Sequence, residues 1–263
     1  MLWGCVLSLW LLPAQAQETT DSTSTKQREY ARMFAVGHCD ILDTYLSPEK
    51  YKGTELRYIS HQTRYFASGR LAQTMVHQGA FTTTDNRADT GSELGGGYNF
   101  QYILRYQWQL LPQLTVAAGG AADVNFGFLY NTRNGNNPAQ LKASINLAPS
   151  VALRYNFGSK RWAFRLSYEA MAPAVGVMFS PNYGQSYYEI INEDDKDHNI
   201  VVTTTATTPS LRQMLTIDIR PTRKWRRTWL RLGYYGDFQQ ARVNNLKYHQ
   251  YSHLFILGYV KGI

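Results

Sequence analysis

An acidic run ending in histidine is the stretch of this sequence that most readily suggests chemistry. It reads Glu193-Asp194-Asp195-Lys196-Asp197-His198 and lies in the polar segment from Ser180 to Pro209. A carboxylate beside an imidazole can act in general acid–base catalysis, and clustered carboxylates can bind calcium. However, EF-hand spacing is missing, no second acidic pair is placed opposite the run, and a charge run is typical of a solvated loop. We therefore expect neither a catalytic residue nor a metal site here.

A second set of charged residues recurs with a period of two along predicted strands. Its members are Arg105, Asp123, Arg154, Arg165, Glu169, Arg212, Asp218, Arg220, Arg231 and Asp237. If the strands close into a barrel, these side chains meet across its interior. They then either pair and fill the interior or line a narrow, charge-selective pore. We expect a filled interior, because eight strands leave space only for side chains and ten leave little more.

The remaining candidate residues favour structural roles. His38, His61 and His77 fall on separate predicted strands without metal-ligand spacing, so ordinary wall or lumen positions are expected. Gly95-Gly96-Gly97 precedes a strand rather than a helix and is not a phosphate-binding loop. No cofactor is expected.

The strand from Tyr98 to Leu110 positions part of the charged set. Its apolar face carries Tyr98, Phe100, Tyr102, Leu104, Tyr106, Trp108 and Leu110; its other face carries Asn99, Gln101, Ile103, Arg105, Gln107 and Gln109. A period of two places each set on its own face of a strand. The strand exceeds the roughly 5–6 residues usual in soluble sheets and suits a tilted membrane crossing.

The connections between such strands alternate between short and long. Short ones centre on Gly69, Leu111, Ser159 and Thr222; long ones are Asp43 to Gly53, Thr84 to Glu93, the Asn131 loop, Ser180 to Pro209 and Ala241 to Gln250. This pattern predicts an all-β, up-and-down antiparallel transmembrane barrel of about ten strands with both termini periplasmic. Another hairpin within Ser180 to Pro209 would either project outside or raise the count to twelve.

Tryptophan positions indicate which face meets lipid. Trp108, Trp162, Trp225 and Trp229 all lie close to predicted short turns. Amphipathic rings at one level are typical of an interfacial girdle. A soluble barrel, which would point its apolar face inward, is therefore the weaker alternative.

The first residues are typical of a secretory signal. Leu2 to Leu12 is apolar, and Ala14-Gln15-Ala16 forms a small-x-small cleavage site. We predict a signal peptide over 1–16, a disordered periplasmic leader over 17–29 and the barrel over 30–263. The usual positive residues before the apolar run are missing, which leaves open whether Met1 is the true start. Cleavage leaves Cys39 as a single cysteine, which excludes an internal disulfide.

The net charge of +8, from 27 basic and 19 acidic residues, favours anionic neighbours. We expect these to be outer-membrane lipids rather than nucleic acid, because the basic residues are dispersed and no nucleic-acid-binding motif is present. A monomer is expected, and any extracellular or periplasmic protein partner is left open.

The chain resembles uncharacterised, porin-like outer-membrane barrels of Bacteroidetes-type Gram-negative bacteria, which are domains of unknown function. The similarity covers nearly all of the chain after residue 16 and is most pointed at Ile41-Leu42-Asp43-Thr44-Tyr45-Leu46-Ser47-Pro48 followed by Tyr51-Lys52-Gly53. The last strand, with Phe255, Leu257 and Tyr259 on one face, resembles a barrel-assembly signal but ends in Ile263 rather than an aromatic residue. The resemblance implies recognition by the barrel-assembly machinery and brings no activity.

Three functions follow from these features. The first is a non-enzymatic structural or interaction role through long extracellular loops. The second is a narrow porin for small, anionic solutes, suggested by the arginines of the polar face. The third is a hydrolase at the barrel mouth, because Asp197-His198 invites comparison with ten-stranded outer-membrane proteases.

Overall fold

The computed structural model describes residues 28–159, 162–194, 197–221, 225 and 227–262. The predicted signal peptide and most of the predicted leader lie outside these residues. The described elements are β1 (Arg28–Asp43), β2 (Lys50–Phe66), β3 (Leu71–Asn86), β4 (Ser92–Leu111), β5 (Leu114–Asn131), β6 (Ala139–Gly158), β7 (Ala163–Met171), β8 (Val175–Phe179), α1 (Tyr187–Asn192), β9 (Ile200–Thr204), β10 (Leu211–Arg220), β11 (Thr228–Val243) and β12 (Leu246–Gly262). Because β1 begins at Arg28, Arg28 and Glu29 belong to the barrel and not to the leader.

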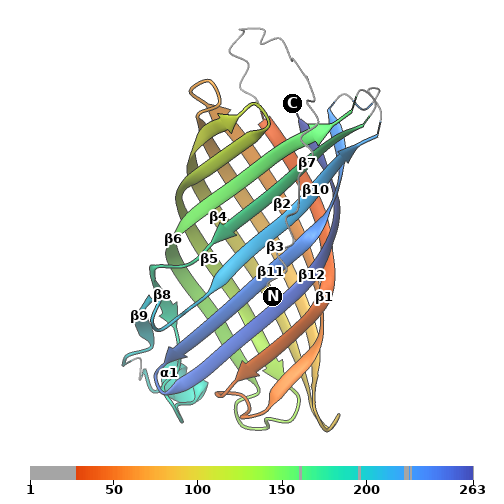
Figure 1. The fold of residues 1–263 in the computed structure, drawn as a ribbon. Helices are drawn as coiled ribbons and strands as arrows, with labels where there is room; N and C mark the ends of the chain where they lie inside the picture. Colours follow the sequence, from red (N-terminus) through yellow and green to blue (C-terminus); the bar gives the residue numbers. More distant parts are fainter. Residues whose placement is uncertain (1–27, 160–161, 195–196, 222–224, 226, 263) are drawn as a thin grey trace, which may run out of the picture.

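Ten of the described strands close into an antiparallel barrel in the order β1 to β7, then β10, β11 and β12 (Figure 1). The first and last strands complete the ring, from Glu29 opposite Gly262 to Asp43 opposite Tyr248. Both described chain ends and the connections β2–β3, β4–β5, β6–β7 and β10–β11 lie at one end, here called the turn end. The opposite end, here called the loop end, carries α1 and the connections β1–β2, β3–β4, β5–β6 and β11–β12.

The two additional strands form a hairpin outside the ring. β8 continues the line of β7 along β6, since Ala172 and Ala174 still donate to the Pro149 and Leu147 carbonyl oxygens. β9 pairs with β8 from Val175 opposite Thr204 to Phe179 opposite Ile200. The predicted extra hairpin therefore exists among the described residues, but it does not raise the number of barrel strands to twelve.

Three predicted loops are wrong because backbone pairing continues beyond the apolar residues. β11 and β12 are joined by Asn244 and Asn245 alone, whose φ values of 50° and 59° suit a type I′ turn, not by a long loop from Ala241 to Gln250. β2 already begins at Lys50, and β3 extends to Asn86. The first two predicted loops are thus reduced to residues 44–49 and 87–91.

The alternation of side chains follows the barrel wall, with the apolar face outside. Phe34 is 71% exposed, Phe126 61% and Leu147 60%. Alternate residues such as Met33 and Ile256 point inward and are fully buried. The inward apolar residues form a cluster within the lumen, while charged residues occupy other inward positions. This arrangement excludes the soluble barrel with an inward apolar face.

Helix α1 is short and lies at the loop end (Figure 1). Its capping box is complete: the Ser186 side chain accepts from the Glu189 backbone N–H, and the Glu189 carboxylate accepts from the Ser186 N–H. In the part of the chain that the structure describes, no helix has the length and apolar character of a membrane span.

Candidate functional site

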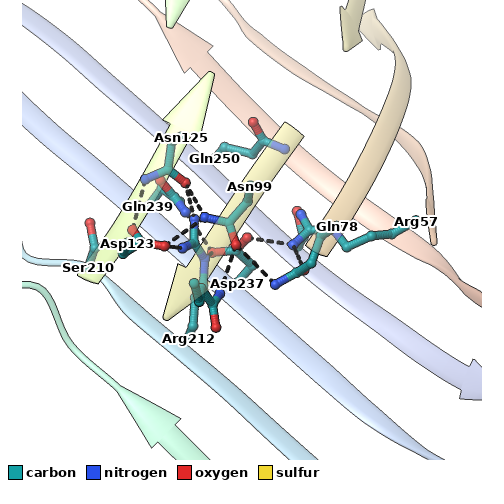
Figure 2. Close-up of polar contacts among 12 residues, drawn as sticks. Arg57, Gln78, Asn99, Asp123, Asn125, Ser210, Arg212, Asp237, Gln239 and Gln250 are labelled. Atoms are coloured by element: carbon teal, nitrogen blue, oxygen red, sulfur yellow. Dashed lines mark hydrogen bonds and ion pairs between the residues drawn. The ribbon is translucent and has the colours of Figure 1, made fainter. Parts of the chain in front are cut away.

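Five charged side chains meet in the middle of the lumen and form what we call the central network: Glu55, Arg57, Asp123, Arg212 and Asp237 (Figure 2). Arg57 lies 2.6 Å from the Glu55 carboxylate and 2.7 Å from Asp237. Arg212 pairs with Asp123 and lies 3.0 Å from the other Asp237 oxygen. All five side chains are buried, so the two arginines and three carboxylates form one continuous chain across the barrel.

Amides and a hydroxyl supply most of the remaining hydrogen bonds of this network. Asn99 donates to Asp123 over 2.6 Å, and the Arg57 guanidinium donates to Gln78 over 3.1 Å. Ser252 on β12 donates to Glu55 on β2 over 2.5 Å, across the intervening strand β1. Figure 2 shows the labelled side chains of this network, Arg57, Asp123, Arg212 and Asp237, converging from several strands of the wall. Buried charges with this many partners are held in one geometry.

A second group, of five charged residues and one tyrosine, lies nearer the turn end and is here called the turn-side network: Glu29, Tyr65, Arg154, Arg165, Asp218 and Arg231. Arg231 donates to both Asp218 oxygens, at 2.6 and 2.8 Å, which is the strong bidentate geometry. Arg165 pairs with Glu29, and Arg154 donates to the Tyr65 hydroxyl over 2.9 Å. These contacts join six strands across the lumen.

Between the two networks lies a small cavity. Its volume is about 40 Å³, and Ile59, Val76 and Ile103 contribute to its lining. Arg105 and Glu169 also border it and form an ion pair of 2.5 Å. A buried water needs roughly 10–15 Å³ of such volume, so the cavity accommodates only a few waters.

The structure brings the predicted polar-face residues together inside the barrel. Every residue of that predicted set except Arg220 takes part in one of the two networks or in the Arg105–Glu169 pair. Arg220 instead stacks over the Trp229 ring at 4.7 Å. Sequence reasoning missed Glu29, Glu55 and Arg57. A signal was available, because the apolar Leu56 and Tyr58 alternate with Glu55 and Arg57. With Leu56 and Tyr58 on the outer face, a period of two places Glu55 and Arg57 inside the barrel.

The four predicted girdle tryptophans do not share one environment. Trp108, Trp162 and Trp225 are 46%, 41% and 45% exposed on the outside. The prediction for Trp229 is wrong, because its ring packs against the interior cluster and beneath Arg165 at 4.9 Å. Trp229 shares the inward parity of Arg231, which explains the difference.

Side chains also close the lumen at the loop end. Lys142 lies 2.5 Å from the buried Asp43 carboxylate and 3.8 Å from the centre of the Tyr248 ring. Tyr187 of α1 packs edge-on against Tyr45 and accepts a hydrogen bond from the Leu141 N–H. Burial raises the pKa of the Tyr45 hydroxyl, and the Ser186 N–H lowers the pKa of Glu189 by hydrogen bonding to its carboxylate. The contacts of Tyr187 with Tyr45 and Leu141 hold helix α1 against the loop end of the barrel.

The other candidate residues remain apart. Asp197 and His198 lie 2.9 Å apart, but their side chains are 80% and 78% exposed. His38 and His77 point outward, whereas His61 lies inside beside Glu169 at 3.4 Å. No group of three or more potential metal ligands occurs among the described residues.

A surface hollow of about 610 Å³ lies between α1 and the β5–β6 loop. Asn136 and Asn137 border it on one side, and Ser186, Tyr188 and Glu189 border it on the other. It is open to solvent and separate from the central network.

Comparisons with known proteins identify a family and a general architecture. The profile of a family described as "Protein of unknown function (DUF3316)" matches residues 2–263. None of the curated proteins matches the sequence.

Several solved outer-membrane barrels are similar in fold. The transport unit of the autotransporter AIDA-I from Escherichia coli is 9% identical, with a TM-score of 0.49 and 92% of each chain covered. The outer membrane protease OmpT from Escherichia coli is 7% identical, with a TM-score of 0.49 and coverage of 94% of this chain and 99% of that chain. An outer membrane channel from Pseudomonas putida F1 is 11% identical, with a TM-score of 0.39 and coverage of 94% and 100%. These similarities concern the fold alone.

Proposed function

We propose that this chain, which belongs to the DUF3316 family of proteins of unknown function, is an outer-membrane barrel with a closed lumen. In this proposal the protein is not an enzyme and acts through contacts made at its loop end. The turn end then faces the periplasm and the loop end faces the outside.

The outer surface supports insertion into a membrane. Outward positions along the wall carry large apolar side chains, among them Phe34, Leu104 and Phe255, each more than half exposed. Soluble monomeric proteins rarely expose apolar patches of this extent, which are typical of a membrane or protein contact. The barrel strands complete their backbone pairing around the ring, which meets the main requirement for a strand in lipid.

The observation that carries the closed lumen is the central network. Its arginines are bound to carboxylates rather than directed at a water-filled passage, and the neighbouring cavity holds about 40 Å³. A charge-selective pore needs charges that can exchange their partners with a passing ion. The paired arginines therefore favour a stiffened barrel over an anion pore.

The loop end is the part of the protein most suited to contacts. Tyr188 of α1 borders the surface hollow described above and is 63% exposed. Tyr183, which precedes the helix, is 74% exposed. Tyrosine is enriched at protein interfaces because it offers a large contact area at a low entropic cost. The exposed Asp197–His198 pair lies in the same region, and we assign it no catalytic role.

We expect the folded protein to give no steady ion conductance in planar bilayers. The reason is that the central network leaves no continuous water path for ions. Folding is verified beforehand by heat-modifiable migration on gels, and single-channel currents are recorded at several salt concentrations.

A variant with a hollowed network is the matched control for this measurement. Changing Arg57, Asp123, Arg212 and Asp237 together to serine removes four side chains that cross the lumen at the level of the central network while leaving outward positions untouched. Arg154 and Arg165 of the turn-side network still cross the lumen, so they are changed to serine as well. The combined variant, once shown to fold, is expected to conduct. Steady, salt-dependent current steps from the unchanged protein would contradict the closed lumen.

A further inference from the structure

The outer face of the β8–β9 hairpin is apolar and uncovered. It presents Val175, Val177, Ile200 and Val202, which are 45%, 39%, 69% and 67% exposed. The opposite face of β9 is buried at Thr203. A two-stranded extension with an apolar outer face is expected to need a covering environment, because exposed aliphatic patches are costly in water.

Strand register places this face beside the apolar wall rather than beyond it. Val175 lies opposite Leu147 and Val177 opposite Ile145 on β6, and these wall residues are 60% and 55% exposed. Figure 1 shows β8 and β9 alongside the barrel, nearer the turn end than α1. The hairpin therefore continues the outer surface of the wall sideways.

The aromatic residues of the wall give the approximate level of the hairpin. On β5, Val124 is the partner of Ile145, and the outward residue next toward the loop end is Phe126. Phe126 and its partner Tyr98 belong to the aromatic positions of the loop end, at 61% and 48% exposure. Aromatic rings of this kind mark the boundary between acyl chains and headgroups. The paired residues Ile145 and Val177 thus lie on the acyl-chain side of that boundary.

The free edge of β9 limits how deeply the hairpin is immersed. Within the described chain, β9 pairs with β8 only, so one edge of Ile200–Thr204 has no neighbouring strand. The Thr204 carbonyl oxygen on this segment accepts from the Thr207 and Thr208 N–H groups. Unpaired backbone groups are costly in hydrocarbon, so the rest of this edge needs water.

We infer that the β8–β9 hairpin is a lateral membrane contact whose outer face packs against lipid acyl chains at the loop-end boundary of the bilayer. This inference rests on the proposed membrane location. It assigns the hairpin to lipid and leaves α1 and the surface hollow to contacts outside the membrane. The aliphatic composition of the face suits acyl chains, because protein-binding hot spots are enriched in Trp, Tyr and Arg.

Spin labels at single cysteines test the inference. Cys5 and Cys39 are first replaced by alanine, which removes both natural thiols, and a nitroxide is then attached at Val202→Cys in the protein folded into phosphatidylcholine vesicles. Matched labels at Leu147→Cys on the wall and at Tyr183→Cys near α1 give the lipid and water references. Collision rates with oxygen, which concentrates in lipid, and with a nickel chelate, which stays in water, are measured for each label.

The expected oxygen-to-nickel ratio at Val202 is several-fold above that at Tyr183 and approaches that at Leu147. A ratio equal to that at Tyr183 would overturn the inference and place the hairpin in water. Low collision rates with both reagents would also overturn it, because another protein surface, such as a second copy paired along β9, would then cover the label. If the Leu147 label also reports water, the membrane location itself is wrong.

Discussion

Replacing Arg212 with alanine is expected to lower the free energy of unfolding of the barrel by about 3–5 kcal/mol. Arg212 binds Asp123 and Asp237 and donates to Asn125 over 2.6 Å. Its removal leaves Asp123 without its guanidinium and Asp237 with Arg57 alone, both buried. Reversible urea unfolding in lipid vesicles, followed by tryptophan fluorescence, measures the change.

A surface arginine provides the control for this experiment. Arg87 lies in the β3–β4 loop and is exposed, so Arg87→Ala is expected to change the free energy of unfolding by less than about 0.5 kcal/mol. Combining Arg212→Ala with Asp123→Asn should recover part of the lost stability, since the stranded charge is removed. An Arg212→Ala protein as stable as the Arg87→Ala protein would show that the central network does not support the barrel.

Gly37→Ala is expected to prevent or strongly weaken closure of the barrel. Gly37 pairs with Leu254 on β12, in the pairing that joins the first and last strands. A Cβ atom at this position would lie 2.0 Å from the His253 carbonyl oxygen, a backbone atom that cannot move without disturbing the ladder. We expect a loss of at least about 3 kcal/mol in the free energy of unfolding, or no folded species. The heat-modifiable fraction on unboiled gels measures closure.

Gly79→Ala is the matched control, because Gly79 also lies within a barrel strand. It pairs with Tyr98 on β4, and a Cβ atom there would meet nothing within 4 Å. This variant is expected to fold like the unchanged protein. Equal folding of the two variants would mean that the close approach of β12 to Gly37 is not required for closure of the barrel.

Much of the fold follows from the sequence, because a strand has a side-chain period of two. The alternation from Tyr98 to Leu110 places Arg105 inside and Trp108 outside, and the structure has the same faces. The even number of barrel strands also follows, since short and long connections alternate along a meander. These properties are local, and each depends on neighbouring residues alone.

Strand ends were predicted less well. The sequence suggests a loop from Ala241 to Gln250, whereas β11 and β12 continue to Val243 and from Leu246. Polar side chains at strand ends resemble loop residues, yet their backbones pair once a neighbouring strand is in place. This pairing depends on backbone hydrogen bonds to a neighbouring strand, so the local sequence pattern does not predict it.

The pairing of charges was decided by the tertiary structure. The sequence determined that Arg212 and Asp123 face the lumen, but they are 89 positions apart and meet only because the barrel closes. Strand tilt and stagger set which inward residues reach one level, and the sequence does not display these quantities directly. The alternating pattern thus determined a barrel with a charged interior, while the closed geometry of the ring decided that the charges neutralise each other and fill the lumen.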